Sequence, residues 1–192
     1  MNRLLLCLSL LCGILLSHAQ TVEIAKYNDG FGRERVIQMT LKNNNPSSII
    51  IPCEKDDGSD AYILQPINYL FALEAYLAEI KGKYAEWTEV AVSNEVKEYE
   101  KELTASGYLY GFLWYNPEQR YGSSGLKATW KYSQDNNLMV ATAKVVDNSG
   151  SSEIANFQIS FSCVNDIDML LDAISTSNIK AHTPSNTDSL FN

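Results

Sequence analysis

Apolar and polar side chains alternate along the first stretch of the chain, with the period of two that is typical of half-buried β-strands. Residues 37–42 (Ile-Gln-Met-Thr-Leu-Lys) place three apolar side chains on one face and three polar ones on the other. Residues 28–30 (Asn-Asp-Gly) predict a turn before this strand. We therefore expect a set of N-terminal strands, the last of which is short, covers residues 49–51 and ends at Pro52.

The period changes after Pro66, where apolar residues begin to recur at steps of three and four, as on one face of an α-helix. The apolar positions are Leu70, Leu73, Leu77, Ile80, Tyr84, Trp87 and Ala91. Gly82 lies inside this pattern and costs up to about 1 kcal/mol relative to alanine, which allows a kink or a short break there. Residues 93–94 (Ser-Asn) mark a boundary, after which residues 96–103 keep an apolar edge at helical spacing and Gly107 serves as a C-terminal cap.

Four further strands are predicted between this helix and residue 163, because runs of apolar or alternating residues are separated by clusters of turn-forming residues. They cover residues 108–115, 126–132, 138–146 and 155–163. The run at residues 122–125 (Gly-Ser-Ser-Gly) is predicted as a turn between two of these strands rather than as a phosphate-binding loop. Such short connections favour an antiparallel meander.

A final helix is predicted from Asn165 or Asp166 onward, with an apolar stripe between Ile167 and Ile174. The order of elements predicts an α+β fold: N-terminal strands, one long helix that can kink, a four-stranded antiparallel meander and a C-terminal helix, with the long helix packed on one sheet face. We expect one domain over residues 20–177, followed by a polar tail over residues 178–192.

The first nineteen residues have the pattern of a secretory signal peptide. Arg3 precedes an apolar run over residues 4–16, and residues 17–19 (Ser-His-Ala) place small side chains before a cleavage site at Gln20. About 13 apolar residues are too few to span a bilayer comfortably, so an uncleaved membrane anchor is the weaker alternative. A lipid anchor at one of the two cysteines in this run is another. We expect an exported protein, periplasmic or extracellular, with no transmembrane segment after signal removal.

Charge and histidine content narrow the range of functions. The 192 residues carry a formal net charge of −8, which becomes −9 once Arg3 is removed with the signal peptide. Phosphate backbones repel such a chain, so we expect no nucleic-acid partner. After cleavage His182 is the only histidine, which disfavours both imidazole-dependent acyl transfer and zinc chemistry. The acidic turn at residues 56–60 does not match an EF-hand loop, and we expect no metal and no cofactor.

Two cysteines remain after signal cleavage, and export makes their oxidation possible. Cys163 lies on the predicted inward face of its strand, and Cys53 follows the short strand at residues 49–51. We expect a disulfide between them, which would close a loop of about 110 residues and stabilise the fold by up to about 4–5 kcal/mol. Two separate buried thiols are the alternative.

Aromatic residues are concentrated around the first strand of the predicted meander. That strand places aromatic side chains on both of its faces, and one helix cannot cover both, so some rings are expected to be exposed for protein contacts or sugar stacking. The alternative is that cross-strand aromatic pairs hold the sheet together. The candidate binding residues are Tyr108, Tyr110, Trp114, Tyr115, Arg120 and Tyr121.

These patterns predict a small exported binding domain without enzymatic activity, which binds a protein or a glycan through an aromatic-rich sheet edge. Two alternatives stay open. One is a carboxylate-based hydrolase acting on extracellular polysaccharide, for which Glu95, Glu98 and Glu102 supply acids at helical spacing. The other is an inhibitor or immunity-type protein, whose negative charge would steer it toward a secreted enzyme.

Overall fold

The computed structural model describes residues 20–104, 107, 109, 112–116, 119–146 and 153–184. The predicted signal peptide and cleavage site precede this part of the chain. Within it, no helix is both long enough and apolar enough to cross a bilayer.

The described residues form nine strands and four helical segments. The strands are β1 (Gln20–Asn28), β2 (Glu34–Lys42), β3 (Asn45–Lys55), β4 (Asp60–Pro66), β5 (Glu98–Glu102), β6 (Phe112–Asn116), β7 (Gln119–Ser133), β8 (Asn137–Val146) and β9 (Glu153–Phe161). The helical segments are η1 (Ile67–Tyr69), α2 (Leu70–Ser93), α3 (Val164–Ile174) and α4 (Thr176–Ala181).

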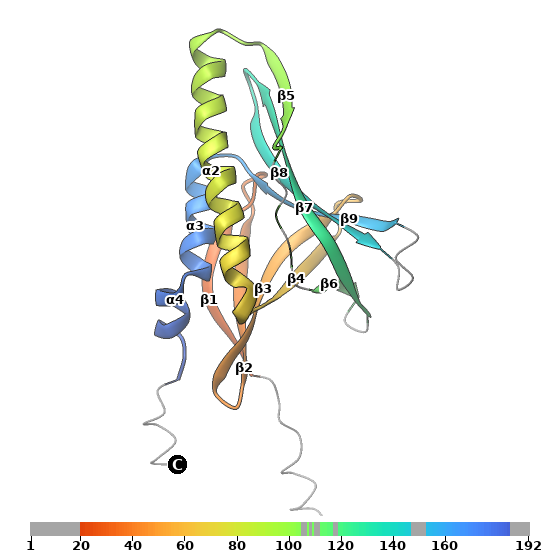
Figure 1. Cartoon of the computed structure of the whole chain (residues 1–192), viewed down its shortest axis with the longest axis vertical. Helices are drawn as coiled ribbons and strands as arrows, with labels where there is room; N and C mark the ends of the chain where they lie inside the picture. Colours follow the sequence, from red (N-terminus) through yellow and green to blue (C-terminus); the bar gives the residue numbers. More distant parts are fainter. Residues whose placement is uncertain are drawn as a thin grey trace, which may run out of the picture.

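All nine strands belong to one sheet, and each pairing in it is antiparallel. The main order is β1-β2-β3-β4-β6-β7-β8-β9, and β5 pairs with β7 beside this path. A short pairing between β3 and β9 closes a ring of strands through β4, β6, β7 and β8. Figure 1 shows α2 along the length of the molecule with α3 and α4 beside it. The predicted α+β class and the β6–β9 meander are confirmed.

The long helix α2 buries the apolar stripe that its sequence predicts. The stripe forms one core with α3 and the sheet, and the helix passes through Gly82 as one continuous element. Tyr84 fixes α2 to the sheet, because its hydroxyl donates to the carbonyl oxygens of Asn137 at 3.1 Å and Ser162 at 2.5 Å. Burial raises the pKa of Tyr84, so the hydroxyl keeps its proton and remains a donor.

The predicted helical continuation after α2 is wrong, because this segment forms the strand β5. Glu95 has a positive φ of 51°, which ends α2 and reverses the chain. Residues in β5 then pair with β7, where Lys131 and Lys127 come close to Glu100 and Glu102. A helix of some ten residues is marginal by itself, so sheet pairing outweighs the helical spacing of the apolar residues.

The structure differs from the sequence prediction in three further places, at β3 and β4, at residues 122–125 and at the start of the expected polar tail. Pro52 lies inside β3 rather than ending it, and β4 adds a strand that the sequence pattern did not predict. Residues 122–125 lie inside β7 next to a register shift, where a turn was expected. The expected polar tail begins with α4, which is held by the buried side chain of Ile179.

The disulfide expected between Cys53 and Cys163 is not formed: Cys53 is a buried free thiol and Cys163 an exposed one. The strand β9 ends at Phe161, so Cys163 no longer points into the core but serves as the N-cap of α3. Glu54 lies opposite Gln158, and in this register Cys53 comes opposite Ile159. The four residues from there to Cys163 span about 13 Å of strand. Disulfides require Cα atoms within about 7 Å.

Candidate functional site

The six predicted binding residues lie outside the part of the chain whose side chains are described. Tyr108 and Tyr110 fall outside the described residues altogether. The other four have a described backbone only, in β6 and β7. Those four are Trp114, Tyr115, Arg120 and Tyr121. The binding edge predicted from them stays a prediction.

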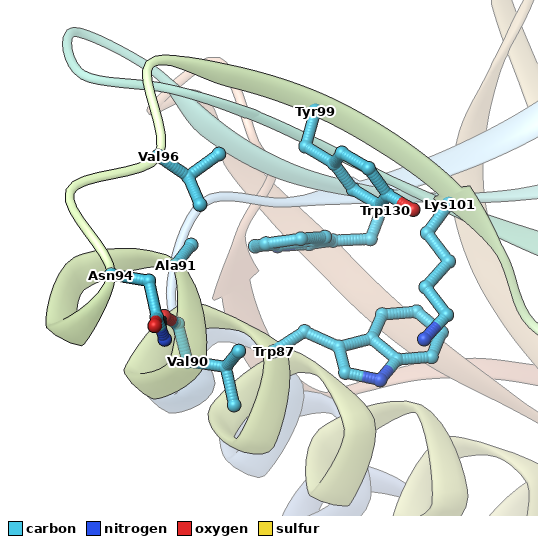
Figure 2. Close-up of a pocket in the computed structure, with 8 residues that line it drawn as sticks. All are labelled: Trp87, Val90, Ala91, Asn94, Val96, Tyr99, Lys101 and Trp130. Atoms are coloured by element: carbon cyan, nitrogen blue, oxygen red, sulfur yellow. Dashed lines mark hydrogen bonds between the residues drawn. The ribbon is translucent and has the colours of Figure 1, made fainter.

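A different aromatic surface lies at the end of the molecule where α2 passes into β5. It is a cleft of about 410 Å³, which we call the aromatic cleft (Figure 2). Its lining is apolar apart from one amide, one phenol and one ammonium group. The residues are Trp87, Val90, Ala91, Asn94, Val96, Tyr99, Lys101 and Trp130.

The pairing of β5 with β7 brings the sheet side of the cleft together. Lys101 lies opposite Trp130, and Tyr99 lies opposite Tyr132, so these four side chains share one face of the sheet. Figure 2 shows α2 on the other side of the cleft, with Trp87 and Val90 on it and Trp130 between the helix and β5. Trp87 on α2 and Trp130 on β7 thus lie side by side in the cleft, next to Lys101 on β5.

The two indoles form the floor of the cleft and are held in place from several sides. Trp130 is 2% exposed, and its ring lies 5.9 Å from that of Trp87 at an angle of 51°. On its other side Trp130 stacks with Tyr132 at 5.3 Å. Its Nε1 donates to Asn137 Oδ1 at 2.7 Å, and the Asn137 amide donates to Thr88 Oγ1 at 2.9 Å. The floor is therefore rigid, and the Trp130 N–H is not available to a ligand.

The mouth of the cleft is exposed and apolar, in contrast to its floor. Val90 is 55% exposed and Tyr99 is 54% exposed. Lys101 places its Nζ 4.5 Å from the centroid of the Trp87 ring, a cation–π arrangement. It forms no ion pair with any residue in the described part of the chain. The mouth thus offers apolar surface together with one cation that has no carboxylate partner.

The end of α2 is shaped by a Schellman-type C-cap, which also forms one wall of the cleft. Val96 N donates to Ala91 O at 2.9 Å, and Glu95 N donates to Val92 O at 3.2 Å. Glu95 has the left-handed conformation that this motif requires, with φ of 51°. Val96 and Ala91 both line the cleft, which matches the apolar contact typical of such caps.

A second cluster, of charged residues, lies where β1, β2 and β3 meet. Arg35 donates to Asp29 Oδ2 at 2.9 Å, to Glu54 Oε1 at 3.0 Å and to Asp60 Oδ1 at 2.8 Å. Arg33 contacts both Asp29 and Glu54. Burial by itself would raise the pKa of Asp29, but hydrogen bonds from Arg33, Arg35 and the backbone of Phe31 outweigh it and hold this pKa below its usual value.

This charged cluster does not resemble a site for acid–base chemistry. A general acid needs a raised pKa, whereas Asp29 is kept ionised by two arginines. Glu54 is buried between the same two arginines. The cluster therefore holds strands together. Among the residues that the structure describes, no group of three or more histidine, cysteine, aspartate or glutamate residues is arranged to hold a metal ion.

The sequence predicted an aromatic binding surface but missed most residues of this one. The helical spacing predicts Trp87 in the buried stripe of the long helix, and it predicts Tyr99 and Lys101 in a helical continuation over residues 96–103. The alternation of Glu-Tyr-Glu-Lys-Glu in β5 is the signal that could have placed Tyr99 and Lys101 on a common face.

Comparison of the chain with protein-family models, with curated proteins and with solved structures finds no match.

Proposed function

We propose that this protein is an exported binding protein without enzymatic activity, and that it takes a protein or glycan ligand in the aromatic cleft. The observation that carries the proposal is the contrast within the cleft, where a rigid indole floor lies below an exposed apolar mouth. Aromatic rings of this kind are enriched where proteins bind partners, because they bury a large area at a small cost in side-chain entropy.

The remaining polar groups of the cleft support binding rather than catalysis. Lys101, Asn94 and Tyr99 supply its polar atoms, and the Asn94 amide donates to Val90 O at 2.8 Å. None of the described residues that line the cleft is a carboxylate. A hydrolase that uses two carboxylates has no support here. Of the buried carboxylates elsewhere, Asp29 and Glu54 are paired with Arg33 and Arg35, and Asp166 accepts hydrogen bonds from Ser162 and Cys163 at the start of α3.

The proposal is tested with two valines that lie close together on α2. Val90 lines the cleft and is 55% exposed, whereas Val92 is 62% exposed and lies outside the cleft. We would probe the purified protein and the variants Val90→Asp and Val92→Asp against a glycan array and a random-peptide array. Thermal melting of all three proteins checks that the fold is kept.

The proposal expects ligands that bind the unchanged protein and Val92→Asp equally, and that Val90→Asp no longer binds, because an aspartate would place a charge in the apolar mouth. Equal loss in both variants, or no reproducible ligand on either array, contradicts the proposal.

A further inference from the structure

We propose that the ligand of the aromatic cleft is an extended, basic segment of a partner protein, which adds as a strand to the open edge of β5. This inference rests on the proposed function and commits it to one class of ligand. It follows from the backbone of β5, from the charges along this strand and from the polar groups that the cleft lacks.

The strand β5 has an edge that can accept another strand. Among the described strands, only β7 pairs with β5. Leu103 N donates to Ala128 O at 2.8 Å, so the backbone N–H of Leu103 points toward β7. Backbone groups alternate in direction along a strand, so those of Glu98, Glu100 and Glu102 point away from β7. They are the donors and acceptors that an added strand would pair with.

The charges on β5 specify what kind of strand fits this edge. Glu98, Glu100 and Glu102 are exposed and share the sheet face opposite the cleft. Residues directly opposite one another in an antiparallel pair share a face, so an added strand places its own side chains beside these three carboxylates. Lys131 and Lys127 of β7 contact Glu100 and Glu102, so the three carboxylates exceed the lysines beside them by one negative charge. Lysine or arginine at alternate positions of the added strand complements this remaining charge.

The other side chains of the added strand would lie on the cleft side. They would pack beside Tyr99 and the stem of Lys101, at the mouth that also exposes Val90. Apolar side chains fit there, because the walls are apolar and the floor is formed by indoles. The expected ligand therefore alternates basic and apolar residues, which is also the pattern of an extended segment with two different faces.

A glycan fits the same cleft less well. Sugars need several hydrogen-bond partners along with a ring face, and here the Trp130 N–H is used by Asn137 and an N–H of the Asn94 amide by Val90, which leaves chiefly Tyr99 and Lys101. Both indoles are at least nine-tenths buried, so neither offers an open platform. An added strand, by contrast, finds its hydrogen bonds on the backbone of β5.

A second copy of this chain is also a poor occupant of the edge. In an antiparallel pair of two β5 strands, the residues that point outward oppose each other, and in β5 all three are glutamates. Every register then places glutamate opposite glutamate, which is unfavourable. The row of carboxylates thus selects for a different, basic partner.

The experiment measures binding of immobilised octapeptides to the purified protein. The probe alternates lysine and valine, and three matched peptides test its features. One has the same residues in two blocks, one alternates aspartate and valine, and one is N-methylated on the backbone groups that would face β5. We expect only the alternating basic peptide to bind, with an affinity that falls as ionic strength rises from about 0.05 M to about 0.5 M.

Protein variants locate the binding on β5. Glu100→Pro removes an N–H that points away from β7 and should leave the sheet intact, since proline is tolerated on strand edges. Glu100→Gln removes only the charge. We expect Glu100→Pro to weaken binding by about tenfold or more and Glu100→Gln by about threefold. Val90→Asp should also weaken binding, whereas Val92→Asp should not.

The outcomes separate this inference from the proposed function. Equal binding of the alternating and block peptides, or unchanged binding by Glu100→Pro, overturns strand addition. A glycan that depends on Val90 but not on Val92, with no binding of the basic peptide, overturns this inference and leaves the aromatic cleft as the binding site. If Val90→Asp changes the binding of no ligand, both the strand-addition inference and the proposed function are overturned.

Discussion

The charged cluster around Arg35 and the aromatic cleft are both built by strand pairing, but their groups are satisfied to very different degrees. In the charged cluster, Asp29 and Glu54 are buried and each contacts two arginines. In the cleft, Lys101 contacts a ring but no carboxylate, and apolar surface at Val90 is open to solvent. Groups that satisfy one another hold a fold together, whereas unmatched groups at a surface are available to a partner.

The largest expected effect is at Arg35, whose replacement tests whether the charged cluster is structural. Arg35→Met leaves the buried carboxylates of Asp29 and Glu54 with Arg33 alone, and we expect a loss of about 3–5 kcal/mol in the free energy of unfolding. Urea denaturation measures it. Lys26→Met is the matched control, because Lys26 and Glu34 form an exposed ion pair, and such pairs contribute little to stability. Similar losses in both variants would remove the contrast between the two regions.

The pH dependence of stability sharpens the same contrast. The pKa of Asp29 is lowered in the folded protein, so its contribution to the free energy of unfolding is complete above the unfolded value of about 3.9 and is lost as pH falls further. Urea denaturation at several pH values below about 5 should show a smaller decline for Asp29→Asn than for the unchanged protein. An identical decline would mean that the arginines do not hold this carboxylate ionised.

The smallest expected effect lies beside the cleft and has the opposite sign. Glu95 occupies a left-handed position, φ 51°, that glycine adopts without a Cβ penalty. We expect Glu95→Gly to raise the free energy of unfolding by about 0.5–1 kcal/mol. Glu89→Gly is the control, since it lies inside α2 and should lower stability by about 1 kcal/mol. A loss at both positions would show that the turn after α2 does not favour glycine.

The sequence was informative where burial alone decides the structure. The helix α2 was predictable because seven apolar residues recur at helical steps and all of them are buried. The meander was predictable from the alternation of apolar and polar residues, although the turn expected at residues 122–125 lies inside β7. The strand β5 was not, because its five residues are all exposed and the apolar residues in and around it, Val96, Tyr99 and Leu103, recur at helical steps. Its conformation depends on β7, which lies some thirty residues further along the chain.

The cleft was hidden from the sequence for the same reason. Trp87 occupies a position of the helix stripe that normally signals core, and nothing local distinguishes it from Tyr84 or Ile80. It becomes part of a cleft only because β5 returns alongside α2 and leaves the end of the helix partly uncovered. Trp130 lies in a strand that the sequence predicts, but its neighbours in the cleft, Trp87 and Lys101, come from α2 and β5.

The short pairing of β3 with β9 has a consequence for how the chain reaches this structure. Glu54 and Gln158, which are separated by about a hundred residues, must meet before the ring of strands is complete. Contacts over such distances in sequence form slowly, because the intervening chain must be ordered first. The hairpins of β1–β4 can therefore form before β9 is in place, but the end of β3 at Glu54 and Lys55 keeps an open edge until β9 pairs with it.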